Sequence, residues 1–416
     1  MDVLVLGSGA REHALCWKLS REGGVGRLYA APGNPGMAEL ATLLPLDAAD
    51  AGAVVAACRE HGISFVVVGP EAPLVAGVAD ALRAAGIGVF GPSAEAARLE
   101  GSKLFTKQVL SAAGVPTAAW RAFTDAREAE AYARGQGACV IKADGLAAGK
   151  GVVVASTGEE AAAGVRACAA LGAAGATLLV EERLLGEEVS VMALCDGERY
   201  ALLPTARDHK RVGDGDTGPN TGGMGAVCPA GSLDAQALEA VGRDVMAPTL
   251  SEMRRRGTPF QGVLYAGLML TASGPQVLEF NCRLGDPEAQ VILLSLDEPL
   301  LPLMVACARG ELEARALELK PGVAVGVVAA AAGYPASPRT GDAITGLGSI
   351  PAGVHVFQAG TRRSGDALVT AGGRVLTLCA QGANLDEARA QAYAGVDAVS
   401  FPGMHARRDI GLSPRR

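Results

Sequence analysis

Short apolar runs, each followed by glycine and polar residues, recur along the first part of the chain, at residues 2–6, 65–68 and 88–90. Their length and their β-branched residues predict buried strands, and the helical pattern A-L-C-W-K-L follows the first of them. Parallel strands that release polar loops at their carboxyl ends form a binding crevice there. The pattern therefore predicts an α/β domain with a parallel sheet, whose ligand site lies at these loops.

The first of these loops, G-S-G-A-R-E-H at residues 7–13, stands between a strand and the start of a helix. Backbone N–H groups in that position can hold a phosphate. A dinucleotide fingerprint requires Gly or Ala where Glu12 stands, and the second strand ends in P-G-N-P-G instead of an acidic residue. NAD is therefore disfavoured and a smaller phosphate ester is favoured, with a turn needed only for packing as the alternative.

The pattern changes at residue 101, where a helix bearing Lys103 and Lys107 is predicted; such lysines usually form a solvated face. Two predicted strands then flank the small-residue loop D-G-L-A-A-G-K-G at residues 144–151. Lys142 projects from the first strand, and the loop is able to lie over phosphates with its backbone N–H groups free. It differs from a Walker A motif because it lacks Ser or Thr after the lysine and precedes a strand. We interpret it as a mobile flap over a nucleotide.

Charged residues gather in two further places. Glu181 and Glu182 end a predicted strand, and Glu188 follows after a short turn. Taken singly they are typical of weak surface ion pairs, whereas beside a nucleotide they would accept hydrogen bonds from an amine or from ribose hydroxyls. The polar loop at residues 205–225 is long enough to be either functional or disordered, and we favour a functional loop. Both charge signs occur at residues 208–211, as a site for a zwitterion requires.

The stretch V-L-E-F-N-C-R-L-G-D-P at residues 277–287 combines a predicted strand with oxygen ligands. Because successive strand side chains point to opposite faces, Glu279 and Asn281 share one face. A carboxylate and an amide oxygen so placed can chelate one hard divalent cation, and Arg283 can balance an anion that the cation also holds. The stretch therefore suits a metal-bound nucleotide, with an edge strand bearing solvated polar residues as the alternative.

The composition of the chain limits the kinds of partner and substrate that it can be expected to have. A chain of 416 residues is long enough for several domains, and its formal net charge of -7 removes a general drive toward nucleic acid or anionic membranes. The 9 cysteines are isolated from one another, without a C-x-x-C pair, which is typical of buried cytosolic thiols. The chain opens directly on a strand and has no apolar run suited to a bilayer. We expect a cytoplasmic protein with a small-molecule substrate.

Residues 323–416 contain turn-rich predicted strands and a helix, which predict a small α+β domain. Within it, the G-G-R segment at residues 372–374 lies between two predicted strands. This position favours a hairpin turn over a phosphate-binding loop.

The motifs taken together resemble one family. They include G-x-G-x-R-E-H, A-P-G-N, V-G-P-E-A-P-L, I-K-A-D-G-L-A-A-G-K-G-V, D-H-K-R-V-G-D-x-D-T-G-P-N-T-G-G-M-G, E-F-N-C-R-x-G-D-P-E and a final R-R-D-I-G. In this order they resemble the phosphoribosylamine–glycine ligase family, the glycinamide ribonucleotide synthetases of the ATP-grasp superfamily. The resemblance implies an N-terminal parallel-sheet (pre-ATP-grasp) domain at residues 1–102, an ATP-grasp domain at 103–322 with a mobile lid at about 121–188, and a small C-terminal α+β domain at 323–416.

The resemblance also implies the reaction, an ATP-dependent ligation of glycine to 5-phosphoribosylamine through glycyl phosphate, in the second step of purine synthesis. ATP and at least one Mg²⁺ or Mn²⁺ would be required, no protein nucleophile would be needed, and a monomer without nucleic-acid or membrane partners is expected. A related ATP-grasp ligase or carboxylase and a nucleotide-binding regulator without turnover are the alternatives.

The implied site residues fall into four sets. The metal ligands are Glu279 and Asn281, and the residues implied in catalysis are Lys142, Arg283 and Asp208. The implied nucleotide-binding residues are Lys103, Lys142, Gly149, Lys150, Gly151, Glu181, Glu182, Leu184 and Glu188. The implied binding residues for the sugar phosphate and glycine are Gly9, Arg11, Glu12, His13, Asn34, Pro70, Glu71, Asp208, Arg283, Asp286 and Pro287.

The sequence departs from the wider pattern at two places. Residues 265–270 offer no second acidic metal ligand, which leaves a second ion in doubt. Residues 169–177 are shorter than in the family and lack its usual Phe-Gly, so part of the lid is expected to differ.

Overall fold

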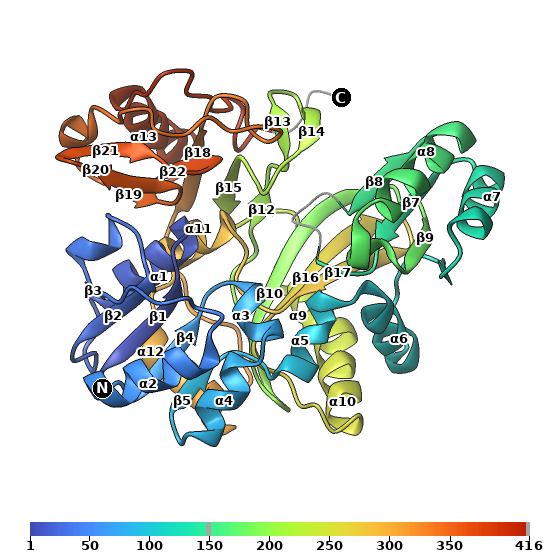
Figure 1. Ribbon diagram of the computed structural model, residues 1–416, viewed down its shortest axis with the longest axis horizontal. Helices are drawn as coiled ribbons and strands as arrows, with labels where there is room; N and C mark the ends of the chain where they lie inside the picture. The colour runs from blue at the N-terminus through green and yellow to red at the C-terminus, as the bar shows by residue number, and fades with distance from the viewer. Residues whose placement is uncertain (147–150, 413–416) are drawn as a thin grey trace.

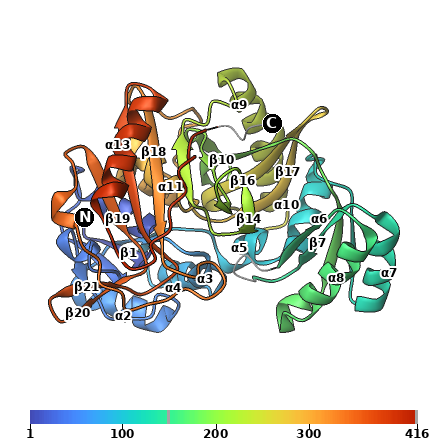
Figure 2. The same cartoon turned by 90° about the horizontal axis from the view of Figure 1, so that it is seen from above.

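The computed structural model describes residues 1–146 and 151–412. Figure 1 shows the N-terminal sheet and the C-terminal sheet at one end of the molecule and the lid at the other, with the central sheet between them. Figure 2 shows the same arrangement from above, with the helices of the lid far from the C-terminal sheet. The multidomain α/β architecture predicted from the sequence is confirmed.

The N-terminal sheet is parallel, as predicted, and the structure gives it five strands in the order β3-β2-β1-β4-β5. Alternate residues of β1 enter two different cores, Val3 and Val5 on one face and Leu4 and Leu6 on the other. Burial on both faces explains why these strands read as unbroken apolar runs. The elements are β1 (Val3–Gly7), α1 (Ala10–Leu19), β2 (Leu28–Pro32), β3 (Thr42–Leu43), α2 (Ala51–His61), β4 (Phe65–Val68), α3 (Glu71–Val75), α4 (Val78–Ala84), β5 (Gly88–Phe90) and α5 (Ala94–Gly101).

The central sheet is antiparallel, in the order β11-β10-β16-β17. A bulge changes the register of its last pair, so that Glu279 stands opposite Gly267 while Val277 stands opposite Leu268. The elements here are α6 (Lys103–Ala113), β10 (Glu187–Asp196), β11 (Tyr200–Leu202), α9 (Ala235–Val241), α10 (Ala247–Arg255), β16 (Gln261–Thr271), β17 (Gly274–Asn281), α11 (Glu288–Ser295) and α12 (Leu300–Arg309).

The lid is a separate four-stranded antiparallel sheet in the order β6-β9-β7-β8, covered by two helices. The predicted hairpin that carries Lys142 is confirmed, since Lys142 pairs with Val152 across β7 and β8. The lid elements are β6 (Trp120–Phe123), α7 (Ala126–Gln136), β7 (Cys139–Ala143), β8 (Val152–Ala155), α8 (Gly158–Ala169) and β9 (Leu178–Glu182).

The C-terminal sheet includes two strands that the sequence placed elsewhere. Its order is β12-β15-β18-β22-β19, and β12 and β15 come from the loop at residues 205–225 and its end. The predicted hairpin at residues 372–374 is wrong, because β21 pairs with β20 while β22 pairs with β18 and β19. The elements are β12 (Arg207–Asp208), β13 (Arg211–Gly213), β14 (Thr217–Asn220), β15 (Gly225–Cys228), β18 (Val323–Ala330), β19 (Val354–Gln358), β20 (Thr361–Ser364), β21 (Ala367–Thr370), β22 (Arg374–Gly382) and α13 (Leu385–Ala398).

Within residues 1–146 and 151–412, no helix is both long enough and apolar enough to cross a membrane.

Candidate functional site

A buried group of two lysines and one glutamate joins the lid to the central sheet. Lys142 of β7 donates from Nζ to the carbonyl of Leu278 on β17 at 2.8 Å and lies 3.1 Å from Glu181 Oε2. Lys107 of α6 lies 2.9 Å from the same oxygen. The flap lysine therefore stands directly against the strand that carries Glu279, the residue after Leu278.

Lys107 is a site residue that the sequence did not identify. It is only 1% exposed, so the alternative of a solvated lysine is wrong at this position. Its Nζ donates to Thr117 Oγ1 at 2.7 Å, and burial lowers its pKa while Glu181 opposes that shift. The sequence feature that could have identified Lys107 is its spacing, because it stands four residues after Lys103 and therefore shares the same helical face.

Glu279 and Asn281 share the partly exposed face of β17, as predicted, while Phe280 between them is buried. Burial opposes the charge of Glu279, yet Lys210, Lys142 and Lys103 hold the pKa of this carboxyl below its ordinary value. An ionised carboxylate beside an amide oxygen fits a hard cation. Among the described residues, no group of three His, Cys, Asp or Glu side chains could hold an ion alone, so ligand oxygens would have to complete the shell.

Arg283 is held by two acids. It donates from Nη2 to Glu100 Oε1 at 2.8 Å and from Nε to Glu71 Oε2 at 3.3 Å, and the second Nη2 contact is Asn281 Oδ1 at 3.4 Å. Glu100, which the sequence did not identify, also accepts from the backbone N–H of Cys282 at 2.8 Å. It therefore orients both the arginine and the turn after β17.

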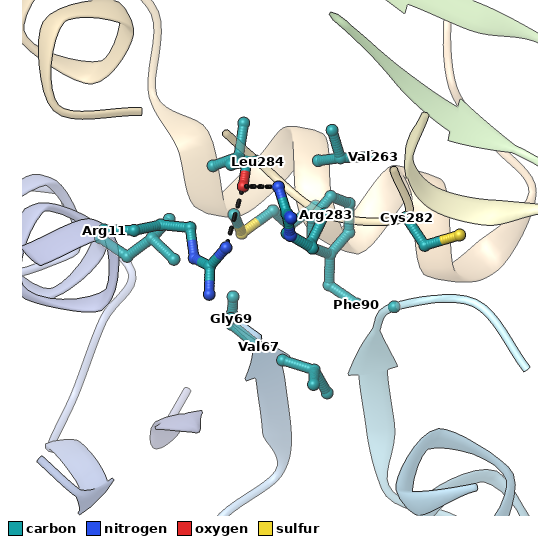
Figure 3. Close-up of a pocket in the computed structure, with 12 residues that line it drawn as sticks. Arg11, Val67, Gly69, Phe90, Val263, Cys282, Arg283 and Leu284 are labelled. Carbon is teal, nitrogen blue, oxygen red and sulfur yellow. Dashed lines mark hydrogen bonds between the residues drawn. The ribbon is translucent and has the colours of Figure 1, made fainter. Parts of the chain in front are cut away.

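Figure 3 shows a small cavity in which Arg283 meets Arg11 of the N-terminal loop. Both guanidinium groups donate to the carbonyl of Leu284, from Arg11 at 3.1 Å and from Arg283 at 3.3 Å. Gly69, at the end of β4, lies beside them. The tertiary structure thus brings the N-terminal loops and the 277–287 stretch to one place.

Glu12 fills the inside of the N-terminal loop. Its Oε2 accepts from the backbone N–H of Gly9 at 2.7 Å, and its Oε1 pairs with Arg11. A Cβ at Gly69 would collide with the Glu12 side chain, so this position requires glycine. Glu12 therefore shapes the loop. Its predicted contact with a sugar phosphate stays a prediction.

His13 and Asn34 both bind the backbone of Gln358 in the C-terminal sheet. Asn34 Nδ2 donates to the Gln358 carbonyl at 2.7 Å, and the Gln358 N–H donates to His13 Nδ1 at 2.8 Å. Burial lowers the pKa of His13 to about 4, which keeps the ring neutral and able to accept at Nδ1. The two residues predicted for the sugar phosphate thus join the N-terminal and C-terminal sheets, and their substrate contacts stay predictions.

Asp208 of β12, which is partly buried, lies within electrostatic range of Glu288, the buried first residue of α11. Burial, followed by the charge of Glu288, raises the pKa of Asp208 well above its ordinary value. Asp208 Oδ1 is buried and has no hydrogen-bond partner within the described part of the chain. Glu288 accepts from Tyr265 Oη at 2.8 Å and from Ser190 Oγ at 3.2 Å. Two acids so placed suit a ligand ammonium group.

Arg374 of β22 closes this part of the site from the C-terminal side. Its Nη1 donates to the carbonyls of Asp286 at 2.6 Å and Gly222 at 2.5 Å. Gly223 has φ +113°, and a Cβ there would collide with Pro287 and Asp208. The sequence singled out residues 372–374 without placing Arg374 in the site.

The remaining predicted residues range from exposed to buried. Glu188 is exposed and pairs with Lys210 at 3.0 Å, and Lys103 Nζ lies 3.5 Å from the Gly145 carbonyl. Glu182 is exposed, Leu184 is partly buried, Gly151 is buried, and Pro70 caps the start of α3. The predicted positions Gly149 and Lys150 lie outside the described residues.

Comparisons with known proteins match the whole length of the chain. Three models of phosphoribosylglycinamide synthetase match it, the N domain at residues 1–100, the ATP-grasp (A) domain at 101–289 and the C domain at 324–413. The chain is 52% identical over 414 residues to the phosphoribosylamine–glycine ligase of Rhizobium meliloti, covering 99% of this chain and 98% of the relative. It is also 52% identical to that of Streptomyces coelicolor, with 99% and 98% covered.

Solved structures give the same result. The crystal structure of phosphoribosylamine–glycine ligase from Thermotoga maritima superimposes with a TM-score of 0.87 at 34% identity, covering 99% of this chain and 100% of that one. A biotin carboxylase domain from Hydrogenobacter thermophilus, solved with MgADP and bicarbonate, superimposes with a TM-score of 0.75 at 18% identity, covering 97% and 91%. At 18% identity, the similarity to the biotin carboxylase domain shows a shared fold and nothing more.

Proposed function

Because the chain belongs to the phosphoribosylglycinamide synthetase family, we propose that it ligates glycine to 5-phosphoribosylamine with ATP, giving N1-(5-phosphoribosyl)glycinamide, ADP and phosphate, in the second step of purine synthesis. The observation that carries the proposal is the contact of Lys142 with the Leu278 carbonyl, which joins a cationic flap to the strand that bears Glu279. Phosphoryl transfer needs this pairing of cations with an ion-binding carboxylate.

The nucleotide phosphates would bind at the lysine cluster. Lys103, Lys107 and Lys142 face the carboxylate of Glu181, and this excess of positive charge suits a polyphosphate. Lys103 and Lys142 would contact the phosphates, and Lys107 would keep Glu181 in place. Glu181, Glu182 and Leu184 would line the adenine side, Glu188 would hold the ribose, and Gly149, Lys150 and Gly151 would cover the phosphates.

The divalent cation would be held by Glu279 and Asn281. The depressed pKa of Glu279 supports this assignment, because it leaves the carboxylate charged at neutral pH. A bound Mg²⁺ or Mn²⁺ supplies charge neutralisation at the phosphate oxygens. At least one such ion is proposed, and β16, which places Tyr265 opposite Asn281, offers no acid there for a second.

Glycine would lie between Asp208 and Arg283. Asp208, whose buried Oδ1 has no hydrogen-bond partner among the described residues, and Glu288 would hold its amine as an ammonium group. This keeps the amine unreactive and leaves the carboxylate as the nucleophile toward the γ-phosphorus. Arg283, already held by Glu71 and Glu100, would orient that carboxylate. Formation of glycyl phosphate would release ADP from the attacked phosphorus.

The second half of the reaction is an amine attack on the activated carbonyl. The phosphoribosylamine nitrogen would bond to the carbonyl carbon of glycyl phosphate, the phosphate would leave, and the nitrogen would lose a proton. The sugar phosphate would lie on the loops that carry Gly9, Arg11 and Pro70, with Asp286 and Pro287 at their border. No protein nucleophile takes part, so catalysis rests on positioning and charge neutralisation.

A coupled assay tests the proposal directly. ADP should be released only when ATP, glycine and freshly prepared phosphoribosylamine are all present. ADP release that does not require the amine would reject the ligase assignment. Replacement of glycine by bicarbonate or formate separates the proposal from a carboxylase or another ligase of the same fold.

Several finer assignments belong to the same proposal. Domain boundaries near residues 102 and 322 are proposed, as is a monomer that binds no nucleic acid. The 9 cysteines are all buried and unpaired, which supports a reducing compartment such as the cytoplasm. Light scattering of the purified protein would test the monomer.

A further inference from the structure

The segment at residues 405–411, here called the tail, lies against the hairpin of β13 and β14. Within the described residues these two strands pair only with each other, and β14 is exposed along its whole length. An isolated two-stranded hairpin is marginally stable in water. The hairpin must therefore be held by contacts from outside itself.

Arg407 provides the strongest of these contacts. Its side chain is only 1% exposed, and Nη1 donates to Asp216 Oδ1 at 2.8 Å and to the Arg211 carbonyl at 3.0 Å. Nε and Nη2 each donate at 2.7 Å to one oxygen of Asp409. Asp216 has φ +55°, a left-handed conformation that aspartate tolerates better than most residues. The buried positive charge of Arg407 is therefore paired with one carboxylate on the hairpin, Asp216, and one on the tail, Asp409.

The rest of the tail follows the same hairpin. Each further contact joins one tail residue to one hairpin residue, so the tail and the hairpin turn are joined at several successive positions. The contacts are Arg408 N to Asp214 Oδ1 at 2.8 Å, Gly215 N to Asp409 Oδ2 at 2.7 Å, and His405 Nε2 with the Val212 carbonyl at 2.7 Å.

The base of the hairpin is continuous with the functional site. Thr221 donates from both N and Oγ1 to the Lys210 carbonyl at 2.8 Å, and Gly411 N donates to His209 Nε2 at 3.2 Å. Lys210 Nζ pairs at 3.0 Å with Oε2 of Glu188, the residue proposed to hold the ribose, and Asp208 stands two residues earlier. The positions of Asp208 and Lys210 thus depend on a loop that the tail holds in place by hydrogen bonds.

We propose that Arg407 is a positioning residue, which clamps the β13–β14 hairpin and thereby fixes the loop that presents Asp208 and Lys210 to the substrates. This inference rests on the roles proposed above for Asp208 at the glycine amine and for Glu188, the partner of Lys210, at the ribose. The family motif R-R-D-I-G at the end of the chain then has a physical function. Loss of Arg407 would leave Asp216 and Asp409 facing each other without their shared cation, and their repulsion would open the clamp.

The test compares three variants of the full-length enzyme with a matched control. Arg407→Ala removes the clamp, Arg407→Lys keeps the charge without the bidentate fork, and Asp216→Asn weakens the same pair from the hairpin side. The control is Arg408→Ala, because the Arg408 guanidinium pairs with Asp397 and not with the hairpin. Amide hydrogen exchange at residues 209–223 and steady-state kinetics with glycine varied are measured for each.

We expect Arg407→Ala to speed exchange at residues 209–223 and to lower kcat/KM for glycine about 10–100-fold relative to Arg408→Ala, since small displacements of site groups cost this much. Arg407→Lys and Asp216→Asn should fall between them. Faster exchange with kcat/KM equal to the control, or unchanged exchange, would overturn the proposal. If Arg407→Ala does not fold, the same criteria apply to Asp216→Asn. A wild-type enzyme without glycine-dependent turnover would instead contradict the proposed function, while the exchange result would still report on the clamp.

Discussion

Lys142 of the lid donates a 2.8 Å hydrogen bond to the backbone carbonyl of Leu278, the residue immediately before Glu279. The contact joins two sheets that share no strand. It places the buried lysine of the lid beside the carboxylate proposed to bind the metal, so the lid and the proposed ion site are in direct contact. Substitution of Lys142 should therefore act mainly on ATP binding, and substitution of Glu279 mainly on the rate.

Lys142→Ala should weaken ATP binding about 10–100-fold, the cost of a charge-assisted hydrogen bond or two. The free energy of unfolding should change little, because Lys107 still compensates Glu181. Calorimetric titration with a non-hydrolysable ATP analogue measures the affinity, and denaturant unfolding measures stability. Wild-type affinity would contradict the placement of the flap lysine on the phosphates.

Glu279→Gln should lower kcat about 100-fold or more while the fold is retained, because charge neutralisation at the transferred phosphate is lost. Only neutral amide oxygens then remain at the site, so Mn²⁺ binding measured by paramagnetic resonance should weaken in parallel. Glu311→Gln, at an exposed position, is the matched control. Unchanged Mn²⁺ affinity in Glu279→Gln would remove this residue from the metal site.

Glu288→Gln should raise the KM for glycine about tenfold or more, because the charge facing the glycine ammonium is lost while the amide oxygen can still accept from Tyr265 and Ser190. The KM for ATP should stay within twofold or so of the wild type. Tyr265→Phe, which removes only the hydroxyl, should have a smaller effect. Equal changes in both KM values would point to a general distortion of the site instead.

The free energy of unfolding should fall as the pH is lowered from about 6.5 toward about 4, through the titration of His13. Burial depresses the folded-state pKa of His13, so the unfolded chain binds the proton first and acid favours unfolding. The stabilising contribution is present above the ordinary value of 6.5 and is lost as the pH falls to about 4. Its full size is about 3 kcal/mol.

His13→Asn provides the control for this pH effect, because the asparagine oxygen can accept from the Gln358 N–H and does not titrate. Denaturant unfolding of both proteins across this pH range would measure the difference in slope. An equally steep loss of stability in His13→Asn would show that other groups cause it.

Much of the fold was predictable because its signals are local. The bounds of β4, β5 and β7 follow from apolar runs that end in glycine or polar residues, and the parallel sheet follows from their alternation with helices. The shared face of Glu279 and Asn281 follows from the period of a strand. The motif order also identified the family, which the comparisons confirm.

The sequence by itself determined which strands and helices form and which side chains have the chemistry for phosphate, metal and amine. Only the tertiary structure decided how those side chains are used. His13 and Asn34 bind Gln358, more than three hundred residues later, and Arg407 binds a hairpin almost two hundred residues earlier. Lys107 became buried, and Glu288 came to face Asp208, through the same kind of long-range packing. Hydrophobic periodicity records which face of an element is buried, but it carries no information about the distant segment that covers that face.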